Sequence, residues 1–364
     1  MCRVICKPSV SLRPVMRLFW SMSGRGRPCA PRFSSRSMNV AVIGGGSWAT
    51  ALVKILCEGS DYVGWWMRSA DNVWHIKKYH HNPRYLSGVD LATERIDISD
   101  DLNHIVAQAD CLILAVPSAF LKDALGSLTV PLQEKLIFSA IKGIVPDDNL
   151  IVGEFLNLRY QVPLEHIGVI TGPCHAEEVA LERLSYLTLA SQNEGAAEKL
   201  AQRMQCDYIK TIVSDDIYGT EYAAVLKNIY ALAAGICHGL GYGDNFQAVL
   251  VSNAIREMKR FMQSVHPLKR DINDSAYLGD LLVTAYSQFS RNRTFGNMIG
   301  KGYTIRSAVL EMNMIAEGYY AARLIREVRK ENDVKMPIAN AVYKVLYRDR
   351  NPRKVMERLA AKLN

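Results

Sequence analysis

The sequence contains no uninterrupted run of about 18 apolar residues, so we expect no membrane-spanning helix. Proline and glycine are scarce, with 13 and 24 among 364 residues, which excludes a fibrous or low-complexity chain. No CxxC pair occurs, and the cysteines after residue 37 are scattered singly. This pattern excludes a zinc site and a disulfide framework, so we expect no metal and a reducing compartment, the cytoplasm.

Acidic residues are absent from residues 1–37. This segment holds eight of the 44 Lys and Arg residues, which leaves 36 basic against 36 acidic residues in residues 38–364. A neutral body has no overall field that attracts a polyanion, and we expect no nucleic-acid partner. The basic leader is either a targeting peptide or sequence upstream of a true start at Met38. We favour the second interpretation and expect the leader to be disordered.

With 49% hydrophobic and 22% charged residues, the chain predicts a soluble globular protein of about two domains. Short apolar runs alternate with helical patterns in the first half, which predicts an α/β domain with a Rossmann-type doubly wound parallel sheet over residues 38–213. The expected strands are 39–43, 62–67, 111–116, 136–141 and 168–170. Residues 214–364 show no strand pattern, and we expect an all-helical substrate and catalytic domain. Its long helices are expected at Gly219–Gly239, Asn245–Ser264 and Ile305–Lys330.

A glycine-rich turn follows the first expected strand. Gly44-Gly45-Gly46-Ser47-Trp48-Ala49 fits the G-x-G-x-x-G/A pattern between a strand and a helix. Gly44 permits the tight turn, and Gly46 lets the backbone approach a pyrophosphate, which the helix N-terminus then binds. The turn therefore predicts a dinucleotide site.

The end of the second expected strand indicates which dinucleotide binds. An acid at this place would hold the adenosine ribose, but the sequence has Met67-Arg68-Ser69. Arg68 can pair with a 2′-phosphate, so we expect NADPH as cofactor, with NADH also accepted. A solvated surface arginine is the alternative.

Several polar residues stand in apolar surroundings. Lys142 follows an expected buried strand directly, and Lys227 lies within a nearly uncharged helix. A buried ammonium needs a counter-charge or a chemical task, and Asp280 is a candidate partner for Lys227. Arg291 is a candidate phosphate clamp.

The chain resembles bacterial-type NAD(P)-dependent glycerol-3-phosphate dehydrogenase across almost all of residues 38–364. The resemblance rests on the order of the strings GGGSWATAL, VPSAFL, KGI, GPCHAEE, EYAAVLKNIYALAAG, GLGYGDN, LGDLLVT, SRNRTFG and AEGYYAA. It implies reversible reduction of dihydroxyacetone phosphate to sn-glycerol 3-phosphate for glycerophospholipid synthesis, and it implies a homodimer.

The resemblance also implies roles for individual residues. The catalytic group comprises Lys227, Lys142 and Asp280. The expected cofactor contacts are Gly44, Gly46, Ser47, Trp48, Arg68, Phe120, Lys142, Ala176, Arg291, Ile315 and Glu317. The expected substrate contacts are Lys142, Gly172, Cys174, Lys227, Asp280, Ser290, Arg291 and Asn292.

Some features depart from the family pattern. Cys174-His175 replaces a more usual Ser-Phe or similar pair, Ala49 replaces a glycine, and the leader has no counterpart. Two other functions are alternatives: a related two-domain carbonyl-acid reductase of the ketopantoate or β-hydroxyacid type, and a dinucleotide-sensing regulator without catalysis. Arg291-Asn292 and the GLGYGDN string favour a small phosphorylated ketone as substrate over a carbonyl acid. A regulator without catalysis would need none of Lys142, Lys227 and Asp280.

Overall fold

The computed structural model describes residues 38–59, 62–146, 148–312 and 316–364; the expected leader and Ile315 lie outside them. Residues 38–364 form one compact unit. Eight strands make one sheet in the order β10-β9-β8-β5-β4-β1-β2-β3. Their bounds are Val40–Ile43 (β1), Val63–Trp66 (β2), Ile96–Ser99 (β3), Cys111–Leu114 (β4), Leu136–Ser139 (β5), Ile167–Thr171 (β8), Ser185–Ser191 (β9) and Ile209–Ser214 (β10). A separate two-stranded hairpin pairs Ile144–Val145 (β6) with Leu150–Ile151 (β7).

The sheet is parallel except at one junction. All five strands expected from the sequence are present as β1, β2, β4, β5 and β8, each parallel to its neighbours among them. The prediction missed β3, β9 and β10, and β9 runs antiparallel to β8. The expected doubly wound parallel sheet is therefore confirmed, with one antiparallel pair between β8 and β9.

Alternate residues of β1 enter two different cores, which is why the sheet is covered on both faces. Val40 and Val42 pack into one core with α1 (Ser47–Glu58) and α7 (Glu194–Met204). Ala41 and Ile43 pack into the other core with α3 (Leu102–Gln108) and α5 (Val152–Tyr160). The smaller helices of this half are α2 (Ala70–Tyr79), α4 (Leu121–Leu125) and α6 (Ala176–Ala180).

After β10 the described chain contains helices and no further strand. The helices are α8 (Ile217–Gly239), α9 (Asp244–Val265), α10 (Asp280–Tyr286), α11 (Arg291–Gly300), α12 (Ile305–Glu311), α13 (Glu317–Glu331), α14 (Pro337–Tyr347) and α15 (Pro352–Ala360). The single helix expected over Ile305–Lys330 is instead two, because α12 ends at Glu311 and Met312 is extended. Within the described residues, no helix is both long and apolar enough to cross a membrane.

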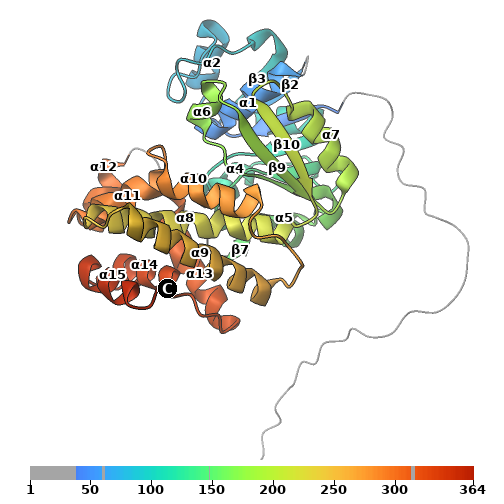
Figure 1. Ribbon diagram of the computed structural model, residues 1–364. Coiled ribbons are helices and arrows are strands. Elements are labelled where there is room, and N and C mark those ends of the chain that lie inside the picture. The colour runs from blue at the N-terminus through green and yellow to red at the C-terminus, as the bar shows by residue number, and fades with distance from the viewer. Residues whose placement is uncertain (1–37, 60–61, 147, 313–315) are drawn as a thin grey trace, which may run out of the picture. The chain divides into compact units, whose positions relative to one another are not determined.

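Helix α8 lies at the centre of the helical half, among α9, α10 and α11 (Figure 1). Nearly all its residues are buried, so the helix is covered on every side. Helix α11 approaches it closely: a Cβ on Gly235 would lie 2.1 Å from the carbonyl oxygen of Arg293, and one on Gly296 would lie 2.3 Å from that of Leu232. Small residues on both helices therefore bring their backbones into contact, which places the start of α11 beside the middle of α8.

Candidate active site

A cavity of about 430 Å³ opens at the carboxyl ends of β1, β4, β5 and β8, where open α/β sheets bind ligands. Helices α8, α11 and α13 close its other side. The lining residues are Gly46, Ser47, Trp48, Tyr85, Ala115, Val116, Pro117, Phe120, Ala140, Ile141, Lys142, Cys174, His175, Ala176, Glu177, Lys227, Asn228, Thr284, Phe289, Ser290, Arg291, Asn292 and Glu317. The cavity thus joins strand ends to helix residues from the second half of the chain.

The glycine-rich turn presents bare backbone to this cavity. Gly44 has a φ of 138°, and a Cβ there would lie 2.6 Å from the carbonyl oxygen of Ala115, so only glycine fits the turn. Gly46 is the N-cap of α1, no side chain caps that helix, and a Cβ on Gly46 would meet nothing within 4 Å. The amides of the first turn are therefore open to an anion, and the turn fits a dinucleotide pyrophosphate.

Two side chains meet above this turn. The Lys142 ammonium nitrogen lies 5.4 Å from the ring centroid of Trp48, within cation–π range. The Trp48 Nε1–H is buried without a hydrogen-bond partner among the described residues. A cation and an unpaired donor thus face the space next to the glycine turn.

Lys227 and Asp280 form an ion pair at the base of the cavity, as the sequence predicted. Their side chains are 4% and 1% exposed. Asp280 begins α10, directly after a π-helical turn over Ser275–Gly279, and Thr171 Oγ1 donates to its Oδ2 at 3.3 Å. Such turns are frequent at functional sites, and here the turn directs the carboxylate toward α8.

Burial lowers the pKa of Lys227 well below its ordinary value. The positive charge of Lys142 lowers it further, whereas the Asp280 carboxylate opposes both effects. The amine and ammonium forms are therefore closer in free energy than for an exposed lysine, as a group that must both donate and accept a proton requires.

Asn228, the residue after Lys227, connects three parts of the site. Its Nδ2 donates to the Lys142 carbonyl oxygen at 2.8 Å, and its Oδ1 accepts from Asn292 Nδ2 at 2.9 Å. The Asn292 Oδ1 in turn accepts the Gly318 backbone N–H at 2.9 Å. This chain of hydrogen bonds fixes the strand end that carries Lys142 to α8, α11 and α13.

Glu317 joins the two halves of the chain. Its carboxylate accepts the Ser118 backbone N–H at 3.0 Å and the Ser118 hydroxyl at 2.7 Å. A Cβ on Gly143 would lie 2.5 Å from both side chains, so the residue after Lys142 must be small. Burial raises the pKa of Glu317, and the Ser118 hydrogen bonds and Arg291 counteract this.

Cys174 and His175 lie on the loop after β8. The Cys174 thiol is buried, which raises its pKa to about 11, so it is a neutral thiol. Burial and the two lysines lower the pKa of His175 to about 4, and its Nε2 is buried without a partner among the described residues. His175 is therefore a neutral ring beside Phe289, whose centroid is 6.3 Å away.

The other expected site residues are distributed around this centre. Ser290 caps α11, with Arg291 following it, and Phe120 and Ala176 also line the cavity. Gly172 has a φ of 121° and lies below the lining, where a Cβ would meet the Tyr186 carbonyl oxygen at 2.6 Å. Arg68 is exposed just after β2 and outside the lining.

The prediction from sequence missed Asn228, Thr171 and His175 as members of the site. Asn228 had a signal, because it is a second polar residue beside Lys227 in an otherwise apolar helix. Thr171 and His175 had none, since their importance comes only from the position of α10 against β8.

Comparison with known proteins gives one family for both halves. Residues 39–197 match the family described as NAD-dependent glycerol-3-phosphate dehydrogenase N-terminus, and residues 216–357 match the corresponding C-terminus. The chain is 35% identical over 325 residues to the glycerol-3-phosphate dehydrogenase [NAD(P)+] of Bacillus subtilis, covering 89% of this chain and 94% of that protein. It is also 35% identical over 326 residues to the Geobacillus thermodenitrificans protein of the same description, covering 89% and 95%.

A solved structure agrees with this assignment. The glycerol-3-phosphate dehydrogenase of Coxiella burnetii superposes with a TM-score of 0.82 at 27% identity, covering 89% of this chain and 98% of that one. The chain belongs to the NAD-dependent glycerol-3-phosphate dehydrogenase family.

Proposed function

We propose that Lys227 is the general acid in the reversible NAD(P)H-dependent reduction of dihydroxyacetone phosphate to sn-glycerol 3-phosphate. The chain is an NAD(P)-dependent oxidoreductase by its family membership, and this decides against the carbonyl-acid reductase and the sensor. The observation that carries the role of Lys227 is its buried ion pair with Asp280 at the base of a cavity that the glycine turn also lines.

The chemistry divides among a few side chains. NAD(P)H, held at the glycine-rich turn, would supply the hydride for the carbonyl carbon, and negative charge would then develop on the carbonyl oxygen. The Lys227 ammonium would stabilise that oxygen and donate its proton to it, a contribution of about 10²–10⁴-fold. In the oxidative direction the neutral Lys227 amine would accept the hydroxyl proton.

Asp280 and Lys142 support this step. Asp280 would orient Lys227 and offset the cost of burying its charge, whereas Lys142 would attract the anionic substrate and keep the pKa of Lys227 low. Ser290, Arg291 and Asn292 at the start of α11 would bind the phosphate, with Cys174 on the opposite side. Gly172 would act through the turn that carries Cys174, since it does not line the cavity itself.

The cofactor would lie along the sheet edge. Gly44, Gly46 and Ser47 would hold the pyrophosphate at the start of α1, with Trp48 and Phe120 beside the dinucleotide. Ala176, Arg291 and Glu317 would contact it from the far side of the cavity. Arg68 would bind the 2′-phosphate of NADPH, for which its exposed position after β2 leaves room.

We further propose that residues 38–213 and 214–364 act as cofactor and substrate domains, and that the protein is a cytoplasmic homodimer. Strands end at Ser214 and helices follow from Ile217, which supports the division. The five cysteines of the described chain are all free, in keeping with a reducing compartment. Light scattering of the purified protein tests the homodimer.

The reaction is tested by following NADPH absorbance with the full chain and either dihydroxyacetone phosphate or unphosphorylated dihydroxyacetone. Turnover with the phosphate ester alone is expected, because the phosphate clamp at α11 positions the carbonyl. Equal turnover with both ketones would overturn the proposed clamp. NADPH binding without any turnover would overturn the role of Lys227.

A further inference from the structure

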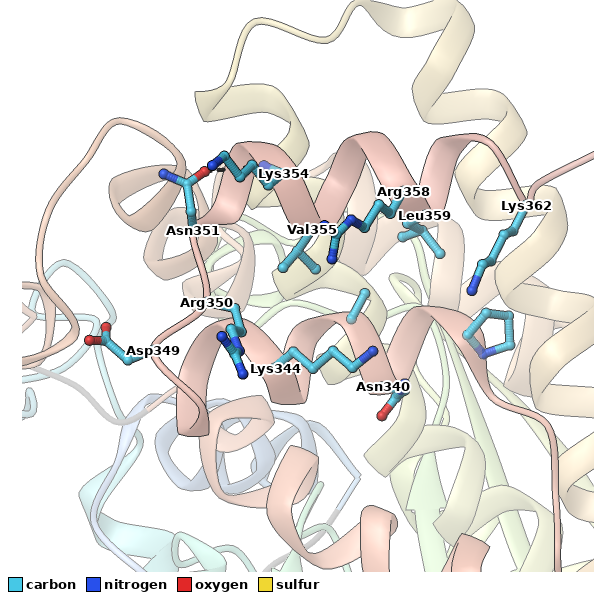
Figure 2. A pocket seen from close by; sticks show the side chains of 12 residues that line it. Asn340, Lys344, Asp349, Arg350, Asn351, Lys354, Val355, Arg358, Leu359 and Lys362 are labelled. Carbon is cyan, nitrogen blue, oxygen red and sulfur yellow. Dashed lines mark hydrogen bonds between the residues drawn. The ribbon is translucent and has the colours of Figure 1, made fainter.

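A groove of about 640 Å³ lies between α14 and α15, and it shares no lining residue with the active-site cavity. Five cations line it: Lys344, Arg350, Lys354, Arg358 and Lys362. Figure 2 shows Arg358 on α15, and Lys362 just after that helix, extending toward α14. Lys344 lies on α14 and Arg350 on the loop that follows it, while the single acid, Asp349, points away. Two walls of positive charge therefore face one space.

None of the five cations forms an ion pair within the part of the chain that the structure describes. The ion pairs found there all involve other side chains. An adjoining hollow differs in this respect, because its arginines already donate to carbonyl oxygens: Arg260 Nε to Lys335 at 2.8 Å and Arg329 to Val334 at 3.2 Å. The groove between α14 and α15 thus holds a set of donors that are free for a ligand.

This charge is local and does not reflect a basic protein body. Residues 38–364 are neutral, yet residues 335–364 contain eight Lys and Arg residues against two acids. Like charges that line one groove repel one another. A bound polyanion would relieve this repulsion.

The volume and the lining of the groove indicate that its ligand is a small molecule. The volume falls within the range of about 300–1,000 Å³ typical of small-molecule sites, and a concave groove does not fit a flat bilayer. The apolar side chains of Ala341, Val355 and Leu359 line the groove together with the cations. We propose that this groove binds a small compound that carries two or three linked phosphates.

Inorganic tripolyphosphate is the probe, and calorimetric titration of the full chain is the measurement. The wild-type protein should bind it, and Arg358→Gln with Lys362→Gln should weaken binding at least about tenfold. Lys344→Gln with Arg350→Gln, on the opposite wall, should do the same. Dehydrogenase activity should remain in both variants and shows that they are folded.

A matched control removes equal charge elsewhere. Lys259→Gln with Lys301→Gln changes two exposed lysines outside the groove, and its affinity for tripolyphosphate should equal that of wild type. Equal weakening in the control would mean general electrostatic attraction and overturn the site. Absence of binding by wild type would overturn it, as would binding to vesicles of anionic phospholipid without binding to tripolyphosphate.

Discussion

The Asp280 carboxylate forms an ion pair with the Lys227 ammonium on a neighbouring helix, and the two side chains are almost completely buried. Thr171 donates to the other carboxylate oxygen, so the strand β8 also holds this acid in place. Both members of the pair belong to the helical half, and the hydrogen bond from Thr171 ties that pair to the sheet. Catalysis and the packing of α8 against α10 and β8 are linked through these two residues.

Replacing Lys227 separates its chemical role from its structural one. Lys227→Met should lower kcat by about 10²–10⁴-fold and leave NADPH affinity close to wild type, because the cofactor is held mainly elsewhere. It should also lower stability by about 3–5 kcal/mol, since Asp280 is left buried and unpaired. Steady-state kinetics, fluorescence titration with NADPH and denaturant unfolding measure the three effects.

The control is the double variant Lys227→Met with Asp280→Asn. It removes both charges, so stability should recover toward wild type while activity stays lost. Activity restored together with stability would show that Lys227 only supports the fold.

Arg68 should discriminate between the two cofactors. Arg68→Asp should raise the KM for NADPH by tenfold or more and change the KM for NADH little, because only the 2′-phosphate meets the new carboxylate. Lys77→Asp on α2 makes the same charge change at another exposed position and serves as control. An equal rise in KM for both cofactors would show that Arg68 does not bind the 2′-phosphate.

Much of this architecture follows from local sequence, and the exceptions have physical causes. Buried parallel strands such as β4 are continuous apolar runs and were predicted. The edge strand β10 is exposed at alternate positions and contains Lys210 and Thr211, and Thr188 interrupts the apolar run of β9, so neither strand has that signature. The break between α12 and α13 was missed, because both flanking segments have helical spacing.

The site was predictable where a charge stands in an apolar segment. Lys227 and Asp280 are such residues, and their pairing could be inferred from the free-energy cost of burying an unpaired charge. Asn228 and Ser118 could not be assigned in this way, because their partners come from distant segments: Ser118 binds Glu317, and Asn228 binds Lys142 and Asn292.

Asn228 should matter for both rate and stability. Asn228→Ala leaves the Lys142 carbonyl and the Asn292 amide without their partners, at about 1–3 kcal/mol for each unsatisfied group. The melting temperature should fall and kcat/KM should fall about tenfold, because Lys142 loses its support. Asn253→Ala on α9 removes an amide whose hydrogen bonds, to the Val249 and Asn364 carbonyl oxygens, are exposed to solvent, and it should change neither quantity; equal effects of the two changes would contradict the argument.

Glu221 should make stability depend on pH. Burial raises the pKa of Glu221 to about 8, although its carboxylate accepts the Gly153 N–H with both oxygens at 3.2 Å. The folded protein thus binds the proton more tightly than the unfolded chain. This stabilisation is complete below the ordinary carboxyl pKa and is lost as pH rises toward 8.

Glu221→Gln removes the titration and keeps one acceptor for Gly153. Its melting temperature relative to wild type should therefore improve steadily from about pH 5 to about pH 9. Glu134→Gln, at an exposed position, should give a constant difference over that range. A constant difference for Glu221→Gln as well would show that the buried carboxyl does not titrate there.

The close approach of α11 to α8 should make one glycine indispensable. In Gly296→Ala the new methyl group would lie 2.3 Å from the Leu232 carbonyl oxygen, so the helices must separate. Overpacking of this kind costs about 1–3 kcal/mol or more, and it should also lower activity, because α11 carries Arg291 and Asn292 into the cavity. In Gly195→Ala on α7 the methyl group would meet only Asn193 Oδ1, at 3.7 Å, and replacing a helical glycine there should raise stability by about 0.5–1 kcal/mol. Denaturant unfolding of the two variants should give shifts of opposite sign, and shifts of the same sign would mean that the two helices tolerate a wider separation than their packed backbones indicate.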